Sequence, residues 1–279
     1  MAELGERASW VNLDFGGADW DSLLRGAGVV HHYAWGSVPG TANDPSEDFT
    51  TNVQPTLRLL EALRQVAVRR EAPSLIFPSS GGTVYGKVRN VPTREDHPLA
   101  PINVYGAGKA SAELYLGVYR AIHGLDCRVA RLSNPFGAGQ DLSRGQGAAT
   151  TFVYQALSDQ PIHIWGDGEV VRDYIHVSDA AAGLVALACA PRNDRCWIFN
   201  MGSGEGVSLN GIVAELEGHL NKTLEVLREP GRQIDIPISV LDNGLARNNL
   251  GWSPKLSFSD GISRTLTDLK HHAVLSDLT

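Results

Sequence analysis

The stretch VYGAGKASAELYLGVYRAIHGLDCRVARLSN (104–134) decides the fold of this chain. Its first part, residues 104–124, is typical of a helix and closes on a glycine, a residue that commonly ends helices. The part that follows, residues 125–134, is typical of a strand. A helix that leads directly into a strand indicates a parallel βαβ unit.

The same alternation runs through the first half of the sequence. Residues 50–68 carry apolar side chains at helical spacing, which predicts a helix with one buried face. We predict further strands at 9–15, 28–35 and 73–80, and a further helix at 20–27. The fold class is therefore α/β, a Rossmann-like doubly wound parallel sheet that binds ligands at the carboxyl ends of its strands.

After residue 134 the pattern changes. A Gly-rich loop at 134–148 precedes short strands around a GDG turn within 161–177. Helices are predicted at 177–190, 208–220, 245–254 and 258–274. These segments predict a smaller lobe interleaved with the first domain. We expect residues 1–133 plus about 173–203 in the larger domain, and about 134–172 plus 204–279 in the smaller α/β lobe.

Composition narrows the class of protein. The chain has 279 residues, of which 43% are apolar and 20% charged, as in a globular protein with a sizeable core. A net charge of -7 argues against nucleic acid or an anionic membrane as the main partner. The three cysteines form no CxxC motif and show no metal spacing. With no signal peptide or apolar span, we expect a soluble cytoplasmic protein without a metal site.

Tyr105 and Lys109 stand four residues apart on the predicted helix, so both side chains lie on one face. A free tyrosine titrates near ~10. A nearby ammonium favours the phenolate and is expected to lower the pKa of Tyr105. A tyrosine tuned in this way can take a proton from a substrate hydroxyl. The alternative is a chance pair on an exposed helix.

Hydroxyl residues follow a predicted buried strand in FPSSGGTVYG (77–86). Such a strand end is where an α/β sheet binds its ligand. Ser79, Ser80 or Thr83 could donate a hydrogen bond to a substrate oxygen. The alternative is a Ser/Gly turn in which a hydroxyl caps the backbone.

Together these residues resemble the extended short-chain dehydrogenase/reductase family, and within it the NAD-dependent sugar-nucleotide epimerase/dehydratase group typified by UDP-glucose 4-epimerase. The resemblance runs from about Trp10 to the C-terminus. It rests on motifs in the family's order: NLD, VVHHYAW, TTNVQPT, SSGGTVYG, YGAGK, RLSNPFGAGQ, GDGEVVRDYIHV, FNMGSG and NLGWSP.

The resemblance implies a role for each matching residue. Tyr105 would be the acid/base, and Lys109 would bind the nicotinamide ribose of NAD and lower the tyrosine's pKa. Other residues that the resemblance places at the cofactor are Asp14, Ala34, Trp35 and Asn52. A nucleotide-sugar substrate would meet Asn134, Arg172 and Arg232, and arginine forks suit phosphate oxygens. The alternative for each arginine is a surface ion pair. The larger domain would hold the cofactor and the smaller lobe the nucleotide sugar.

The sequence departs from the family pattern at two places. The catalytic Ser/Thr would fall at Gly81, so Ser80, and after it Thr83, are the expected substitutes. The acidic pair of the dehydratases is absent, which favours epimerisation or reduction over dehydration. The N-terminal glycine-rich βαβ unit, typically ~30 residues, is also expected to be missing. Three explanations compete: a truncated product, residues from another chain, or the loss of NAD.

Three functions follow as hypotheses. The first is 4-epimerisation of a UDP-hexose through a transient keto-sugar, with NAD. The second is a pseudoenzyme or non-redox protein that keeps the nucleotide-sugar pocket without NAD, and the third is an NAD(P)-dependent keto-sugar reductase. Members of the family often dimerise through the tyrosine helix, so a homodimer is expected. Its interface, or alternatively the core, would contain Leu59, Leu63, Leu116 and Tyr119.

Overall fold

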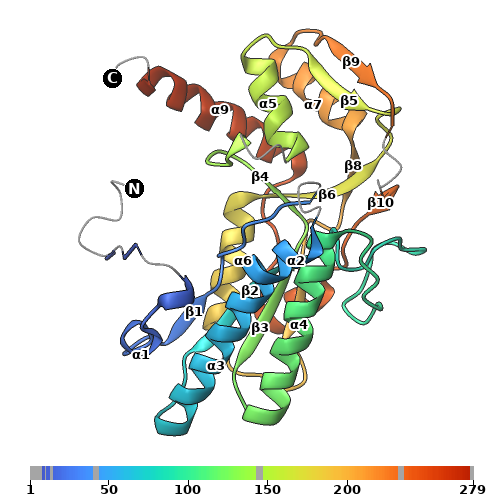
Figure 1. Ribbon diagram of the computed structural model, residues 1–279. Helices are drawn as coiled ribbons and strands as arrows, with labels where there is room; N and C mark the ends of the chain where they lie inside the picture. Colours follow the sequence, from blue (N-terminus) through green and yellow to red (C-terminus); the bar gives the residue numbers. More distant parts are fainter. Residues whose placement is uncertain are drawn as a thin grey trace.

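The chain forms a larger layered α/β part and a smaller part beside it (Figure 1). The computed structural model describes residues 8–9, 11–12, 15–39, 44–142, 147–231 and 236–276. Asp14 and Arg232 lie outside the described residues, so the roles predicted for them stay predictions.

Four parallel strands make the larger sheet, in the order β1–β2–β3–β7 (Val29–His31, Ser74–Ser80, Cys127–Leu132 and Ile198–Met201). The register places Val30 opposite Leu75, and Phe77 opposite Val129. The two central strands are buried along most of their length, which is why they are apolar runs rather than alternating ones. The predicted α/β fold with a Rossmann-like parallel sheet is confirmed.

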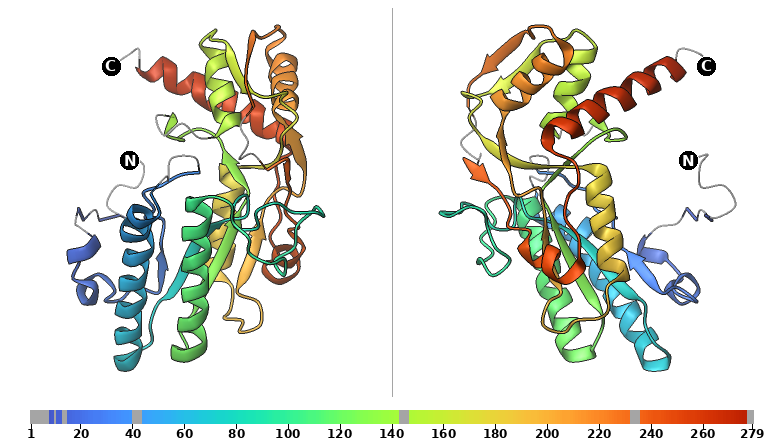
Figure 2. Two further views of the ribbon diagram at one scale, coloured as in Figure 1. Left: turned by 45° about the vertical axis from the view of Figure 1, so that its right-hand side comes forward. Right: turned by 180° about the vertical axis from the view of Figure 1, so that it is seen from behind.

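Helices cover both faces of this sheet (Figure 2). Helices α3 and α4 lie on one face, and α6 and α8 on the other (Gln54–Arg69, Val104–His123, Val177–Cys189 and Gly244–Leu250). Successive side chains of a strand point to opposite faces. Leu75 and Phe77 therefore pack under α3 and α4, whereas Ile76 between them packs under α6.

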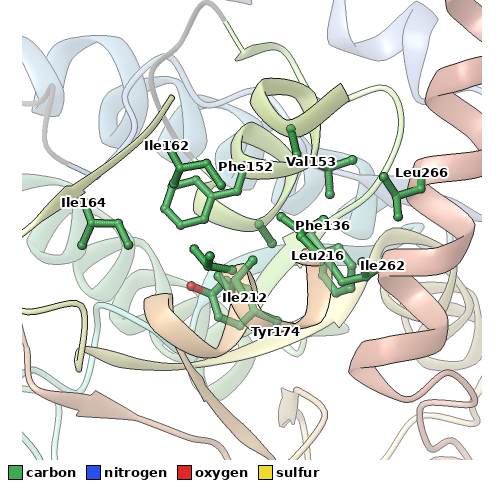
Figure 3. Packing of buried hydrophobic residues seen from close by; sticks show 13 residues of the cluster. Phe136, Phe152, Val153, Ile162, Ile164, Tyr174, Ile212, Leu216, Ile262 and Leu266 are labelled. Atoms are coloured by element: carbon green, nitrogen blue, oxygen red, sulfur yellow. The ribbon is translucent and has the colours of Figure 1, made fainter. Parts of the chain in front are cut away.

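The remaining elements form a second core, shown in Figure 3. They are β4 (Asn134–Phe136), α5 (Ala148–Leu157), β5 (Ile162–Trp165), β6 (Val171–His176), β8 (Gly206–Ser208), α7 (Leu209–Leu220), β9 (Val226–Glu229), β10 (Ile238–Ser239) and α9 (Phe258–Ser276). Strand β6 lies between β4 and β10 and also pairs with β8, whereas β5 pairs with β9. Phe136, Phe152 and Tyr174 are buried between these strands and the helices.

Two short helices, α2 (Pro45–Asp48) and η3 (Phe49–Val53), lead into α3 and contact α4. Two others, η2 (Phe15–Gly17) and α1 (Trp20–Leu23), precede β1 and contact α3. The Asp44 side chain caps α2 by accepting the N–H of Ser46, and Pro45 supplies a fixed first residue. The run from α2 to α3 includes a π-helical turn at η3, a rare conformation that often occurs at functional sites.

The structure differs from the sequence prediction in several segments. The strand expected at 9–15 falls partly outside the described residues, and Phe15 begins a 3-10 helix instead. Helix α1 is shorter than the predicted 20–27. Residues 245–254, expected in the terminal lobe, contain Ala246 and Trp252, which pack with α6 under the sheet. The Trp252 indole N–H donates to the Asp179 carbonyl at 3.1 Å, which holds this segment against α6.

Of the four residues considered for a dimer interface, the three leucines are internal. Leu59, Leu63 and Leu116 are at most 1% exposed and belong to the core between α3, α4 and the sheet, while the partly buried Tyr119 packs against that core. The leucines therefore belong to the core of the subunit, which was the alternative to a dimer interface. The exposed apolar residues of α4 are Leu114, Tyr115, Val118 and Ile122.

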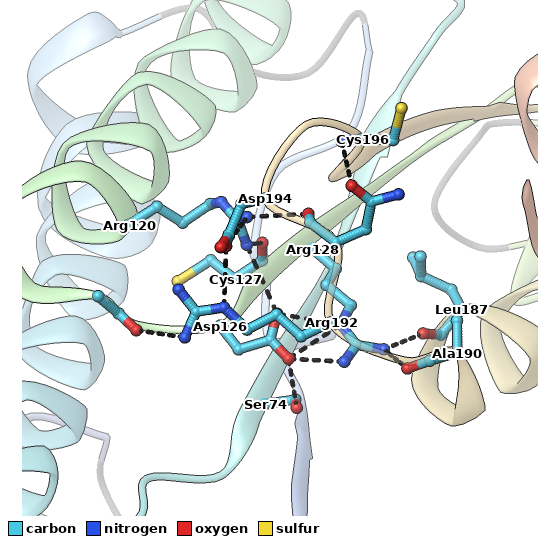
Figure 4. A network of polar contacts seen from close by, with 12 residues as sticks. Ser74, Arg120, Asp126, Cys127, Arg128, Leu187, Ala190, Arg192, Asp194 and Cys196 are labelled. Atoms are coloured by element: carbon cyan, nitrogen blue, oxygen red, sulfur yellow. Dashed lines mark hydrogen bonds and ion pairs between the residues drawn. The ribbon is translucent and has the colours of Figure 1, made fainter.

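A polar network ties the sheet to α6 at the end opposite the strands' carboxyl ends (Figure 4). Arg128 donates to the carbonyls of Leu187 and Ala190, both at 2.6 Å, and pairs with Asp126 at 2.6 Å. Ser74 of β2 donates to the same aspartate. The last carbonyls of a helix have no partner within the helix. Arg128 therefore completes the C-terminal end of α6 and joins it to β2 and β3.

We expect Arg128→Met to lower the free energy of unfolding by about 3 kcal/mol, because it leaves the α6 carbonyls without their buried partner and removes the shorter of the two ion pairs of Asp126. Urea denaturation followed by circular dichroism measures the change. The matched variant Arg192→Met removes an arginine that is 44% exposed and should cost under about 1 kcal/mol. Equal losses in the two variants would contradict this account of α6.

Candidate active site

Helix α4 brings Tyr105 to the carboxyl end of β2. The helix begins at Val104, and the Asn103 side chain caps it by accepting the N–H of Gly106 at 2.7 Å. Tyr105 therefore lies in the first turn, and it lines one cavity together with Ser80, the last residue of β2. Among the hydroxyls weighed from the sequence, Ser80 is the one that lines the cavity with Tyr105, whereas Ser79 donates to Glu113.

Lys109 lies one turn further along α4 and is 5% exposed. Its ammonium donates to the carbonyl of Pro78 at 2.9 Å. It also lies 3.9 Å from the centre of the Trp35 ring and 4.7 Å from that of Phe77. The charge is therefore enclosed by a backbone carbonyl and two aromatic faces.

Burial dominates the protonation of both residues. It raises the pKa of Tyr105 to about 12, although the hydrogen bond with Ser80 acts in the opposite direction. The negative charge of Asp48 also raises the pKa of Tyr105, and the lowering expected from Lys109 stays a prediction for the site with its cofactor bound. Burial also lowers the pKa of Lys109 to about 7, against the opposing charges of Glu113 and Asp48.

A hydrogen-bonded cluster surrounds Trp35 beside the active-site helix. The Trp35 indole N–H donates to the Ser37 hydroxyl at 3.1 Å, and that hydroxyl donates to Asp48 at 2.5 Å. The Asn52 amide donates to both Ser37 and Asp48, and its oxygen accepts the N–H of Gly36 at 2.6 Å. Asn52, predicted at the cofactor, is fully buried and fixes this segment from inside.

A buried ion pair connects the active-site helix α4 to strand β3. Glu113 and Arg131 pair at 2.6 Å, and their side chains are 2% and 3% exposed. Arg131 also donates to the Tyr85 hydroxyl, which in turn donates to Asn200 of β7. Ser79 of β2 donates to Glu113. These contacts hold α4, β2, β3 and β7 in one arrangement.

Two cavities near Tyr105 share part of their lining. The first, of 390 Å³, is lined by Tyr105 and Ser80 together with the backbone-rich segment 133–140. The second, of 210 Å³, is lined by Trp165, Arg172 and Tyr174. Residues 134–136 and Gly147 line both. The structure thus places a hydroxyl-lined chamber beside one that carries an arginine and aromatic rings.

Of the other predicted site residues, Asn134 and Arg172 line these cavities, whereas Ala34 and Thr83 do not. Asn134 lines both, and its amide donates to the Asp173 carbonyl. Arg172 donates to the Ile236 carbonyl at 2.6 Å, which orients its guanidinium. Ala34 is exposed. Thr83 is buried, its hydroxyl has no hydrogen-bond partner among the described residues, and it does not line the chamber around Tyr105.

Sequence reasoning missed Asp48 and Trp165. Asp48 is 4% exposed and carries the cluster around Trp35. Its position four residues before Asn52 was a signal, because such pairs share a helix face. Trp165 is 42% exposed beside Arg172, and an aromatic residue directly before the GDG turn was the corresponding signal.

The described part of the chain contains no group of three or more His, Cys, Asp or Glu residues arranged to hold a metal ion. No helix there has both the length and the apolar character needed to cross a membrane.

Comparison with known proteins decides the family. Residues 3–202 match the NAD dependent epimerase/dehydratase family. The chain belongs to this family. Two of the motifs that led to the same expectation from the sequence, SSGGTVYG and YGAGK, lie at the end of β2 and the start of α4.

Relatives of this epimerase/dehydratase-family chain include UDP-glucose 4-epimerases. One from Mycolicibacterium smegmatis is 35% identical over 95% of this chain and 84% of its own length. The crystal structure of UDP-glucose 4-epimerase with UDP-glucose from Thermotoga maritima is 30% identical, with a TM-score of 0.87 over 98% of this chain and 87% of that one. The Thermus thermophilus enzyme in complex with NAD is 31% identical, with a TM-score of 0.80 over 92% and 82%.

At the reactive end of the site, Lys109 is the residue that would hold the NAD ribose, although it is 5% exposed and lines neither of the two cavities. An ammonium has three donors, and the hydrogen bond of Lys109 to Pro78 accounts for one. The Tyr105 phenol lines the adjoining chamber, where a substrate hydroxyl has room. For the pyrophosphate end, the expected absence of the glycine-rich unit stays a prediction, since residues 1–7, 10 and 13–14 lie outside the described chain.

We expect Gly108→Ala to lower the melting temperature, although Gly→Ala inside a helix ordinarily stabilises it by about 1 kcal/mol. A Cβ at this position would lie 2.3 Å from an Asp48 carboxylate oxygen and 3.2 Å from the Trp35 ring. Differential scanning calorimetry measures the effect.

Gly117→Ala on the same helix is the matched control. Its Cβ would meet only the Trp197 ring, at 3.4 Å, so this variant should be stabilised. If both variants gain stability alike, α4 does not pack against Asp48 as described.

Proposed function

We propose that this chain is a nucleotide-sugar 4-epimerase that acts on a UDP-hexose through a transient keto-sugar, with NAD as cofactor. The observation that carries the proposal is that Tyr105 and Ser80 line one chamber, which shares Asn134 to Phe136 and Gly147 with a second chamber lined by Arg172 and Trp165. Relatives named as UDP-glucose 4-epimerases support it.

Each chamber has a chemistry that suits one part of such a substrate. Arg172 would neutralise the diphosphate, with Arg232 as its predicted partner. Trp165 offers a ring face for the uracil base, since stacked aromatic rings attract each other. Asn134, which lines both chambers, would contact the sugar where it joins the diphosphate.

The protein's own part in the reaction is proton transfer. NAD, when bound, would supply a hydride acceptor and donor. Tyr105 would accept the proton of the sugar 4-hydroxyl and return a proton to the keto-sugar oxygen, so that the cycle has no net redox change. With a pKa of about 12, the phenol is protonated at neutral pH, which suits the return step. Proton removal needs a lower pKa in the loaded site, and Lys109 is the cation placed one turn away on the same helix to supply it.

Tyr105→Phe tests this proposal. Loss of the phenolic oxygen should reduce kcat for UDP-glucose by about 100-fold or more, because general acid–base catalysis contributes that much. The conversion of UDP-glucose to its 4-epimer is followed by nuclear magnetic resonance. Tyr115→Phe, a 40% exposed tyrosine on the same helix, should retain wild-type activity. Undiminished turnover by the Tyr105 variant would sink the proposal.

Two alternatives predict different results. A protein without redox chemistry would bind the nucleotide sugar but not NAD, so NAD that co-purifies argues against it. A keto-sugar reductase would consume NAD(P)H with a keto-sugar substrate, whereas epimerisation consumes none. A cytoplasmic location is part of the proposal, because the three cysteines are free thiols and thiols of this kind persist in a reducing compartment.

We also propose a homodimer, which would bury the exposed apolar face of α4. Leu114, Val118 and Ile122 recur every four residues and are 66%, 46% and 70% exposed. Such a stripe is the face that a second helix covers in a bundle.

Val118→Glu should therefore convert the dimer into a folded monomer, since it places a charge in the covered stripe. Light scattering on a size-exclusion column measures the mass. Val185→Glu, on the opposite face of the sheet and 59% exposed, should leave the mass unchanged. A wild-type protein that is monomeric at all concentrations would refute the homodimer.

A further inference from the structure

The charge of Lys109 lies against the face of Trp35. The ammonium is 3.9 Å from the centre of that ring, closer than to Phe77 at 4.7 Å or Tyr105 at 5.9 Å. A cation at this distance over an aromatic face is attracted by the ring quadrupole, most strongly for tryptophan. The attraction is larger where water is excluded, and Lys109 is 5% exposed.

The Trp35 ring is held by residues from outside its own segment. A serine hydroxyl has one donor and two acceptor positions. At Ser37 all three are used: it donates to Asp48 and accepts from the Trp35 indole and the Asn52 amide. Asp48 lies on α2 and Asn52 on η3. The orientation of the indole is therefore set by a hydrogen-bonded chain that ends on a buried carboxylate.

The ring also extends from the lysine to the tyrosine. It meets Phe77 edge to face at 5.8 Å and Tyr105 edge to face at 6.5 Å between ring centres. Its edge packs on α4 at Gly108, where a Cβ would approach within 3.2 Å. One side chain thus contacts the surroundings of both residues proposed for the reaction.

We propose that Trp35 is a positioning residue for the reaction, which holds the Lys109 ammonium with its ring face and is itself held by Ser37 and Asp48. The role in the reaction rests on the proposed function. The contact between Trp35 and Lys109 does not, and it can be measured separately.

Burial disfavours the charged form of Lys109 and lowers its pKa to about 7, so small contributions decide its charge at neutral pH. The charged and titratable groups that face it are Asp48, Glu113, Tyr105 and His32. Asp48 and Glu113 favour the ammonium. His32 is neutral at pH 7, since burial and Lys109 bring its pKa to about 4, and Tyr105 is protonated. Loss of the ring face should therefore lower the pKa of Lys109 further.

The pH dependence of acetylation by acetic anhydride, read by mass spectrometry of the peptide that contains Lys109, gives this pKa directly. Trp35→Leu should lower the pKa of Lys109 by roughly one unit, a tenfold change in the protonation equilibrium. Trp35→Phe retains a ring face and should keep most of the wild-type value. Ser37→Ala leaves Trp35 in place but frees its indole, and should give a smaller decrease.

Trp197→Leu is the matched control. Trp197 also contacts α4, at Gly117, and lies over a cation, Arg120, at 5.4 Å. It is remote from Lys109 along the helix, so the pKa of Lys109 should not change in this variant. In parallel, kcat for UDP-glucose should fall about tenfold in Trp35→Leu and recover largely in Trp35→Phe.

The outcomes separate this inference from the proposed function. An unchanged or raised pKa of Lys109 in Trp35→Leu overturns the inference, as does a Phe variant no better than the Leu variant or an equal shift in Trp197→Leu. If the wild-type protein does not convert UDP-glucose but the pKa of Lys109 responds as expected, the contact stands and the proposed function fails. If turnover is normal in Trp35→Leu while the pKa shifts, the contact exists but Trp35 is not a positioning residue.

Discussion

The buried ion pair between Glu113 and Arg131 is the interaction on which the site depends. Both side chains are almost fully buried, and a charge left alone there would cost several kcal/mol. The pair is therefore satisfied on every side: Ser79 donates to Glu113, and Arg131 also donates to the Tyr85 hydroxyl and the Glu95 carbonyl. Because both charges must keep these partners, the ion pair fixes the position of α4 relative to β2 and β3. Tyr105 and Lys109 precede Glu113 on the same helix face, so their positions follow from it.

Close packing on that face explains the small residues of the opening motif. Gly106 and Gly108 are buried where α4 meets its neighbours. At Gly108 the missing side chain leaves room for Asp48 and for the edge of Trp35. The chain thereby places a carboxylate and an indole beside the lysine without a direct ion pair. The charge of Lys109 is balanced between the cost of burial and several weak attractions, which makes it sensitive to each of them.

Local features were predictable from the sequence. Strand β2 and helix α4 were placed within one residue, because apolar runs and glycine stops act over a few residues. The Tyr105–Lys109 pair followed from helical spacing. The contributions of Asp48 and Trp165 were not predicted, because they depend on which distant segments meet. The placement of 245–254 was wrong for a related reason: a short helical pattern does not say whether Trp252 packs on the sheet or in the second core.

By itself, the sequence determined the alternation of strands and helices, the spacing of Tyr105 and Lys109, and the motifs that place the chain in its family. Only the tertiary structure decided that Ser80 is the hydroxyl that lines the cavity with Tyr105, that Trp35 covers Lys109, and that burial raises the pKa of the tyrosine while it lowers that of the lysine. The reason is physical. Helical spacing and turn residues are properties of neighbours in the chain, whereas desolvation and ring contacts depend on segments far apart in sequence that packing brings together.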